Sequence, residues 1–361
     1  RGTKHFPNKT YEQIFAHSKN VLVQTKKSPF SFQHLLPAVN IEPVGFSNEE
    51  ALLPVMARSF QGYRLLQEYF AFPQRFLFFR ISGLRPGIAQ CHHNQIDLAI
   101  LLDEEEPSLE GRLDAGNFAL HCTPAINLFP RRADLIHLSD KFTEFHVVPN
   151  RTRPMDYEVY QVTKVIGYGV RADEIQPFAP FYSAADMAER KGSGAYFTVN
   201  RTPRLMSGRE KQQGRRSNYG GSEVFLSIVD ATAAPYQSGL RQLAVETLCT
   251  NRDLPIQMAV GLGKTDFNLD IASPVESTRC LAGPTAPRPS NAQGETSWRL
   301  INHLSLNYLS LVEGPDQKGS AAIRDLLRLY CDASNSQSKM QVEGLLAVSS
   351  RPITRRLIQQ G

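Results

Sequence analysis

Residues 243–255 read LAVETLCTNRDLP and join the pattern of a strand to that of a tight turn. Alternate side chains in the first half share one face, which predicts a strand with one buried side. These side chains are Leu243, Val245, Thr247 and Cys249. Asn251 and Asp253 are turn formers whose side chains bond back to the backbone, and Pro255 keeps the preceding residue extended. We therefore predict a strand that ends at Cys249, followed by a rigid turn.

Arg252 lies inside this turn. An arginine there can pair with a carboxylate or stack on an aromatic ring, and neither contact requires catalysis. We expect a structural role for the whole turn, which comprises Cys249, Thr250, Asn251, Arg252, Asp253, Leu254 and Pro255.

The rest of the chain mixes short strands and helices. Apolar patterning predicts helices at 11–18, 62–70, 297–312 and 320–330. It predicts strands at 20–25, 76–81, 96–102, 142–148, 157–166, 223–229 and 340–358. Strands do not alternate regularly with helices, so the pattern favours a multidomain, strand-dominant α+β fold over a parallel α/β fold.

One segment differs in composition from its surroundings. Residues 184–221 are rich in Gly, Ser, Arg, Lys and Gln, which is typical of a long exposed loop or linker. We expect three parts: an N-terminal α+β region at 1–183, this basic loop at 184–221, and a β-rich region with two helices at 222–361.

The basic loop also carries the charge of the chain. Residues 188–216 hold eight basic and two acidic side chains, a net charge of +6, while the whole chain has +5. Long loops often carry function, so we treat this segment as a candidate partner-binding site, with a solvated loop as the plain alternative. Its basic residues are Arg190, Lys191, Arg201, Arg204, Arg209, Lys211, Arg215 and Arg216.

Composition narrows the class of protein. The 361 residues are 41% hydrophobic and 21% charged, as in folded globular proteins. Five scattered cysteines favour a reducing compartment, so we expect a cytoplasmic protein. No apolar run reaches the length of about 20 residues that a membrane span needs, and we expect no membrane insertion. The chain begins at Arg1, and we interpret it as an excerpt of a longer protein.

The sequence motifs that would indicate nucleotide binding or metal binding are incomplete. Residues 261–265 (GLGKT) resemble the end of a phosphate-binding loop, but the required first glycine is replaced by Met258. Cys91, His92 and His93 are adjacent, and no partner pair with metal-ligand spacing follows. We expect no catalytic residues, no cofactor and no metal. Two alternatives stay open: a nucleic-acid-associated protein that uses 188–216, and an unrecognised hydrolase.

Four blocks in one order resemble the TssF family of the bacterial type VI secretion system. They are GYRLLQEYFAFP at 62–73, VPNRTRP and YEVY within 148–160, CTNRDLP at 249–255, and WRLINHLSLNYLSL at 298–311. One departure is Asn150, where the family pattern has aspartate.

The resemblance implies a structural baseplate protein similar to wedge proteins of contractile-tailed phages. It implies a protein that docks other subunits, carries out no reaction, and contributes no catalytic residues. The implied partners are TssG, a second TssF copy, TssK, TssE and the VgrG hub. The implied place is the cytoplasm, at a baseplate docked to the membrane complex.

Overall fold

The structure is a computed structural model and groups the chain into two compact units. The first unit combines Arg1–Ala125 with Gln293–Gly361, and the second is Ile126–Ala292. Residues described are 6–25, 32–55, 60–92, 94–171, 173–181, 194–205, 208, 216–230, 239–290, 296–298, 318–331 and 335–348.

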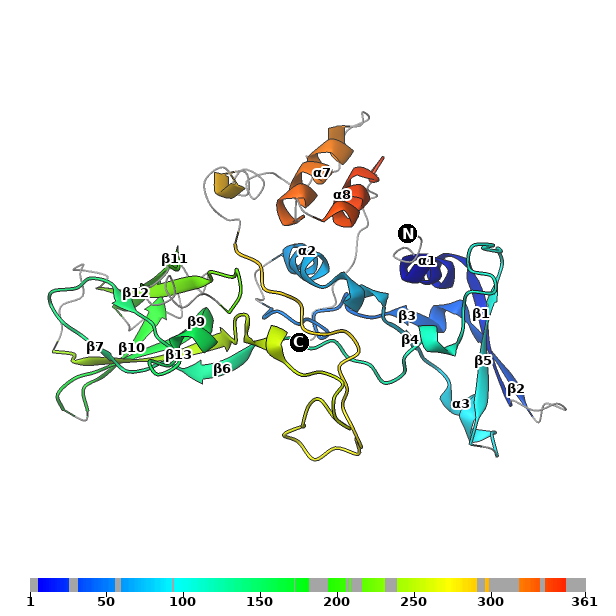
Figure 1. The fold of residues 1–361 in the computed structure, drawn as a ribbon, viewed down its shortest axis with the longest axis horizontal. Coiled ribbons are helices and arrows are strands. Elements are labelled where there is room, and N and C mark those ends of the chain that lie inside the picture. Colours follow the sequence, from blue (N-terminus) through cyan, green and yellow to red (C-terminus); the bar gives the residue numbers. More distant parts are fainter. Residues whose placement is uncertain are drawn as a thin grey trace, which may run out of the picture. The chain divides into compact units, whose positions relative to one another are not determined.

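The first unit contains a three-stranded antiparallel sheet of order β2-β1-β5. Its strands are β1 (Ser18–Thr25), β2 (Gln33–Pro37) and β5 (Ile96–Leu102). Helix α1 (Phe6–His17) contacts β1 and β5, as Figure 1 shows on the right. Val21 and Val23 are fully buried between strand and helix side chains such as Ile14. The predicted helix at 11–18 and the strands at 20–25 and 96–102 are confirmed.

The remaining N-terminal elements of this unit are short. They are η1 (Ala38–Asn40), β3 (Ile41–Pro43), α2 (Gln61–Ala71), η2 (Pro73–Leu77), β4 (Phe79–Ile81), α3 (Arg85–Ala89) and η3 (Ala115–Asn117). The helix predicted at 62–70 is confirmed as α2. The strand predicted at 76–81 is wrong for its first residues, because Pro73 starts a 3-10 turn and strand pairing begins at Phe79.

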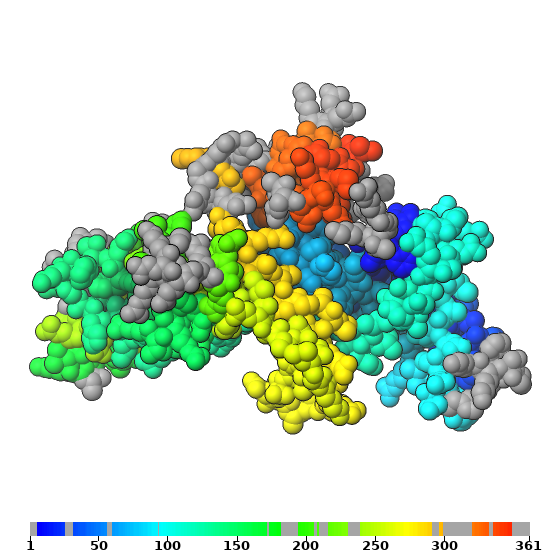
Figure 2. Space-filling view, viewed as in Figure 1, coloured from blue at the N-terminus to red at the C-terminus, as the bar shows by residue number. Residues whose placement is uncertain are grey.

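Two helices follow near the C-terminal end of the described chain. The predicted helix at 320–330 is confirmed as α7 (Lys318–Tyr330), which contacts α2 and α8 (Ser336–Glu343). Figure 2 shows α7 and α8 in orange and red. The strand predicted at 340–358 is wrong for its described part, 340–348, because the Asn335 side chain caps a helix by accepting from Gln337 N and Ser338 N, and no strand follows that helix up to 348. Residues 349–358, and 299–312 of the predicted helix 297–312, lie outside the described residues.

The second unit is built on an eight-stranded sheet. Its main path is β6-β13-β9-β10-β11-β12-β8, and β7 pairs with β13. All pairs are antiparallel except β10 with β11. The strands are β6 (Phe129–Arg132), β7 (Ile136–His137), β8 (Phe145–His146), β9 (Glu158–Tyr168), β10 (Ile175–Pro180), β11 (Ala195–Pro203), β12 (Ser222–Asp230) and β13 (Gln242–Thr250).

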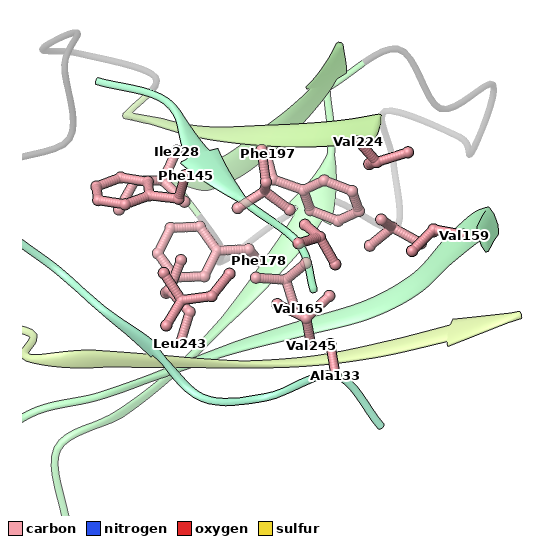
Figure 3. Packing of buried hydrophobic residues seen from close by; sticks show 14 of the residues in the cluster. Ala133, Phe145, Val159, Val165, Phe178, Phe197, Val224, Ile228, Leu243 and Val245 are labelled. Atoms are coloured by element: carbon pink, nitrogen blue, oxygen red, sulfur yellow. The ribbon is translucent and has the colours of Figure 1, made fainter. Parts of the chain in front are cut away.

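The sheet curls around its own apolar core. In Figure 3, Phe178 lies between Phe145 and Phe197 on one side and Val165 and Leu243 on the other. Period-two alternation explains this core, because the inward side chains of β12 and β13 are the ones that the pattern selects. Val224, Leu226, Ile228, Leu243, Val245, Thr247 and Cys249 are all buried. The strands predicted at 157–166 and 223–229 are confirmed, whereas the one predicted at 142–148 shortens to β8.

The sheet includes residues from the segment expected to be a loop. Ala195 and Phe197 of β11 are buried, so residues 195–203 are strand although their composition predicts exposed loop. Strands on both sides of 184–221 pair in this one sheet, and the two compact units therefore differ from the expected three-part division. The strand-dominant α+β class is confirmed.

Candidate functional site

The turn after β13 contains a backbone conformation that residues other than glycine rarely adopt. Arg252 has a φ of 54°, in the left-handed region, and its N–H donates to Thr250 Oγ1 at 3.3 Å. Leu254 N then donates to Asn251 O at 3.0 Å and opens the 3-10 turn η5 (Leu254–Gln257). The strand ends at Thr250, one residue after the predicted Cys249.

The Arg252 side chain lies inside the unit, with 7% of the residue exposed. Its Nη2 donates to Gly220 O at 2.8 Å, and the guanidinium lies 5.8 Å from the centre of the Tyr219 ring. A side chain at position 221 would press on it, since a Cβ there would be 3.0 Å from Arg252 Nη2 and the guanidinium would have to shift. Glycine fits position 221 for two reasons: it has no Cβ to meet the guanidinium, and it readily adopts the positive φ of 74° that the backbone has there.

The next residue of the turn binds the end of the basic segment. Asp253 is buried, and its two carboxylate oxygens contact Arg216 Nε at 3.3 Å and Ser217 Oγ at 2.5 Å. Arg216 also reaches Asp156 Oδ1 at 3.0 Å and donates to Met155 O at 2.6 Å. Arg216 therefore links the turn to η4 (Pro154–Asp156), which precedes β9.

A second carboxylate organises the strand that leaves the basic segment. Glu158 accepts hydrogen bonds from Tyr219 OH at 2.7 Å and from Ser222 N and Oγ at 2.8 and 2.6 Å. Burial and the neighbouring Glu158 carboxylate raise the pKa of Tyr219, so this phenol stays protonated as a donor. Arg201 Nη1 in turn donates to Ser222 Oγ at 2.7 Å.

The turn is also fastened at its outer side. Asn251 and Asn127 exchange hydrogen bonds, Asn251 N to Asn127 Oδ1 at 2.6 Å and Asn127 Nδ2 to Asn251 Oδ1 at 3.1 Å. We call the set Asn127, Asp156, Glu158, Arg216, Tyr219, Asn251, Arg252 and Asp253 the signature cluster. Its charged groups pair with one another or with backbone, an arrangement that rigidifies one end of a sheet.

The signature cluster does not supply an activated nucleophile among its described residues. The adjacent thiol, Cys249, is fully buried, and burial raises its pKa. A thiol in such surroundings is a poor nucleophile, because the reactive form is the thiolate. The geometry fits a structural joint better than a reaction centre.

The structure brings three of the eight basic candidates into internal contacts. Arg216 joins the signature cluster, Arg201 donates to Tyr160 O at 2.7 Å, and Arg204 Nε lies 3.4 Å from Glu223 Oε1. The other five, Arg190, Lys191, Arg209, Lys211 and Arg215, lie outside the described residues. Partner binding by this segment stays a prediction.

We expect Arg216→Ala to lower the free energy of unfolding by about 1 kcal/mol, because Asp253 loses a hydrogen-bonded cation while Ser217 still contacts it. Urea unfolding measures this change. The control is Arg151→Ala, whose exposed side chain lies 3.8 Å from Asp134 and donates to Leu135 O at 3.2 Å, and which should change stability by less than about 0.5 kcal/mol because both contacts are open to water. Equal effects of the two substitutions would contradict the anchoring role of Arg216.

Sequence reasoning missed a buried ionic network in the first unit. Glu68 Oε2 accepts from Arg64 Nη1 at 3.0 Å and from Arg75 Nη1, while Oε1 accepts from the backbone N–H groups of Leu52 and Leu53 at 3.0 and 2.9 Å. The three charged side chains are 0–7% exposed. We call them the Glu68 network.

The Glu68 network also fixes the loop before α2. Arg75 Nη2 donates to Gly45 O at 3.1 Å and Glu50 O at 2.6 Å, and burial lowers the pKa of its guanidinium. The available sequence signal is the arginine and glutamate four residues apart on a helix. The apolar pattern of this helix instead indicates that Tyr63 and Phe70 lie on its buried face, but both are only half-buried.

The metal-like and phosphate-loop motifs are not assembled into sites. Cys91 and His92 belong to no group of three or more metal-ligating residues in the part of the chain that the structure describes. Residues 261–265 lie in a stretch that, from 258 to 290, contains no helix or strand, so the strand and helix that flank a phosphate-binding loop are absent around it. The described residues also contain no helix long and apolar enough to cross a membrane.

Comparison with known proteins gives a consistent result. A family model described as "Type VI secretion system, TssF" matches residues 1–361. A curated protein of Pseudomonas aeruginosa, "Type VI secretion system component TssF1", is 48% identical over 360 residues, which cover 100% of this chain and 57% of that protein. A chain in the cryo-electron microscopy structure of a TssK-TssF-TssG baseplate subcomplex shares the fold, with a TM-score of 0.64 at 19% identity, over 93% of this chain and 57% of that one.

Proposed function

Because the chain belongs to the TssF family of the type VI secretion system, we propose that it is part of a structural baseplate subunit that carries out no reaction. The chain spans 57% of the length of its curated relative, so the proposal concerns the larger protein of which such a chain is a part. One observation supports it: the turn at 249–255, which resembles the family pattern, is a buried structural joint at the ends of strands β9, β12 and β13.

The proposed partners are taken from the solved complex that contains the similar protein. The chain of like fold was solved together with TssK and TssG, which supports TssG and TssK as partners here. We extend the proposal to TssE, the VgrG hub and a second copy of the chain, as the family resemblance implies. The proposed place is the cytoplasmic face of the machine, at a baseplate docked to the membrane complex.

Exposed apolar side chains support an assembly role. Leu120 and Leu262 are 83% and 84% exposed, and several other large apolar side chains are more than half exposed. Where such side chains gather in a contiguous patch, they favour association with partner proteins, or self-association in their absence.

We expect the full-length protein to be poorly soluble or self-associated alone, and to become a defined complex when co-expressed with TssG. Size-exclusion chromatography with mass measurement tests this and gives the number of copies in the complex. A well-behaved monomer that does not bind TssG would contradict the proposed function. Nucleic acid that co-purifies with the protein, visible in its absorbance ratio, would favour the alternative based on 188–216.

A further inference from the structure

A loop of the second unit is closed at its base by hydrogen bonds. Thr265 Oγ1 accepts from Thr278 N at 3.1 Å and donates to Phe267 O at 2.7 Å, and Asp266 N donates to Thr278 O at 2.7 Å. Lys264 Nζ pairs with Glu276 at 3.0 Å across the same base. Residues 265–278 thus form a compact loop with adjoining ends, within the range of about 6–16 residues that Ω-loops cover.

Asp266 connects this base to the backbone on both sides of the loop. Its two carboxylate oxygens accept from Gly261 N at 2.7 Å and from Cys280 N at 2.9 Å. These backbone hydrogen bonds lower the pKa of the Asp266 carboxyl, so it is ionised at neutral pH. Hydrogen bonds to residues before, within and after the loop therefore hold the base, which restricts where the tip can lie.

The tip that this base presents is apolar and exposed. Leu269, Ile271 and Val275 are 53%, 80% and 50% exposed, and Phe267 at the base is 40% exposed. An unpartnered group of large apolar side chains on an otherwise closed loop is unfavourable in water and is typical of an interaction site.

The charges of the loop select the kind of partner. Residues 265–278 contain Asp266, Asp270 and Glu276 and no lysine, arginine or histidine, while the flanking Lys264 and Arg279 contact each other at the base through Arg279 Nε and Lys264 O. Asp266 and Glu276 are engaged at the base, which leaves the exposed Asp270 beside the apolar tip. An apolar knob with a negative rim is complementary to an apolar pocket with a positive rim.

We propose that the 265–278 loop is a docking element that inserts Leu269 and Ile271 into an apolar pocket, bordered by basic side chains, on a partner protein of the assembly. The closed base lowers the conformational entropy that the loop loses on binding, because its two ends are already joined. The inference rests on the proposed function, since the partner is sought among the subunits of the baseplate.

The test uses the full-length protein co-expressed with TssG and TssK. We expect Leu269→Ser with Ile271→Ser to weaken binding at least about tenfold, as loss of buried anchors does. Asp270→Lys should also weaken binding. Added salt should then strengthen the binding of this variant, because salt screens the repulsion between the new lysine and the basic side chains of the partner. Asp266→Ala should weaken it several-fold, because the tip loses its support while keeping its side chains.

A matched control distinguishes the loop from apolar surface in general. Leu113→Ser with Leu120→Ser replaces side chains of similar exposure, 41% and 83%, and should leave binding unchanged. Wild-type binding together with unchanged binding of the Leu269/Ile271 variant would overturn the inference. A large loss of stability in the isolated variant would also overturn it, because the tip would then be covered by its own chain. If the wild-type protein bound neither subunit, the proposed function itself would fail.

Discussion

Replacing Glu68 with alanine is expected to lower the free energy of unfolding of the first unit by about 3–5 kcal/mol, the effect of removing one partner from a buried ion pair. The reason is that Arg64 and Arg75 would stay buried without their counter-charge. The N–H groups of Leu52 and Leu53 would also lose their acceptor. Urea unfolding of the full-length protein gives the change, and hydrogen exchange of peptides from α2 assigns it to this unit.

Two further substitutions separate charge from packing. Glu68→Gln retains one carbonyl acceptor for Leu52 or Leu53 but not the charge, so its effect should fall between those of Glu68→Ala and the wild type. Gln67→Ala changes the exposed neighbour on the same helix and should alter stability by less than about 0.5 kcal/mol. If Glu68→Ala behaved like Gln67→Ala, the network would contribute nothing to the fold.

Alternating apolar patterns predicted three long strands of the second unit's sheet, β9, β12 and β13. Strands β9, β12 and β13 bury one face, so the period-two signal survives in residues such as Val224, Leu226 and Ile228. The prediction failed at β11, because this strand lies inside a segment that is basic as a whole, although Ala195 and Phe197 in its N-terminal half are buried. Local composition cannot report a pairing partner that lies far away in sequence.

Buried charge is the harder feature to predict. Propensity scales place Arg64, Glu68 and Arg75 at the surface, because an isolated charge is rarely buried. Their burial depends on three segments, around residues 45–53, α2 and η2, that meet only in the folded unit. Likewise, the sequence indicated a turn at 249–255 but not that Arg216 from the basic segment would pair with Asp253.

The turn after β13 gives the second large effect. We expect Arg252→Ala to lower the free energy of unfolding by about 1.5–3 kcal/mol, because Gly220 O loses a charged donor. Alanine would also have to adopt the left-handed conformation that Arg252 has at φ 54°. Urea unfolding of the full-length protein measures the loss, and peptides from β13 should exchange faster with solvent.

Glycine and lysine at the same position separate the causes. Arg252→Gly removes the same side chain but tolerates a positive φ, so it should be about 1 kcal/mol less destabilising than Arg252→Ala. Arg252→Lys keeps a cation that can reach Gly220 O, but it loses the planar group that lies over Tyr219. Its effect should be smaller than that of alanine.

Binding to TssG, measured on the same variants, decides between a structural joint and a contact surface. A buried joint predicts that binding falls only in proportion to the loss of folded protein, since Arg252 is 7% exposed and its donors face the interior. The ranking of the variants in binding should then follow their ranking in stability. If Arg252→Ala instead left the unfolding free energy intact and abolished binding, the signature turn would be an interface, and its assignment as a structural joint would be wrong.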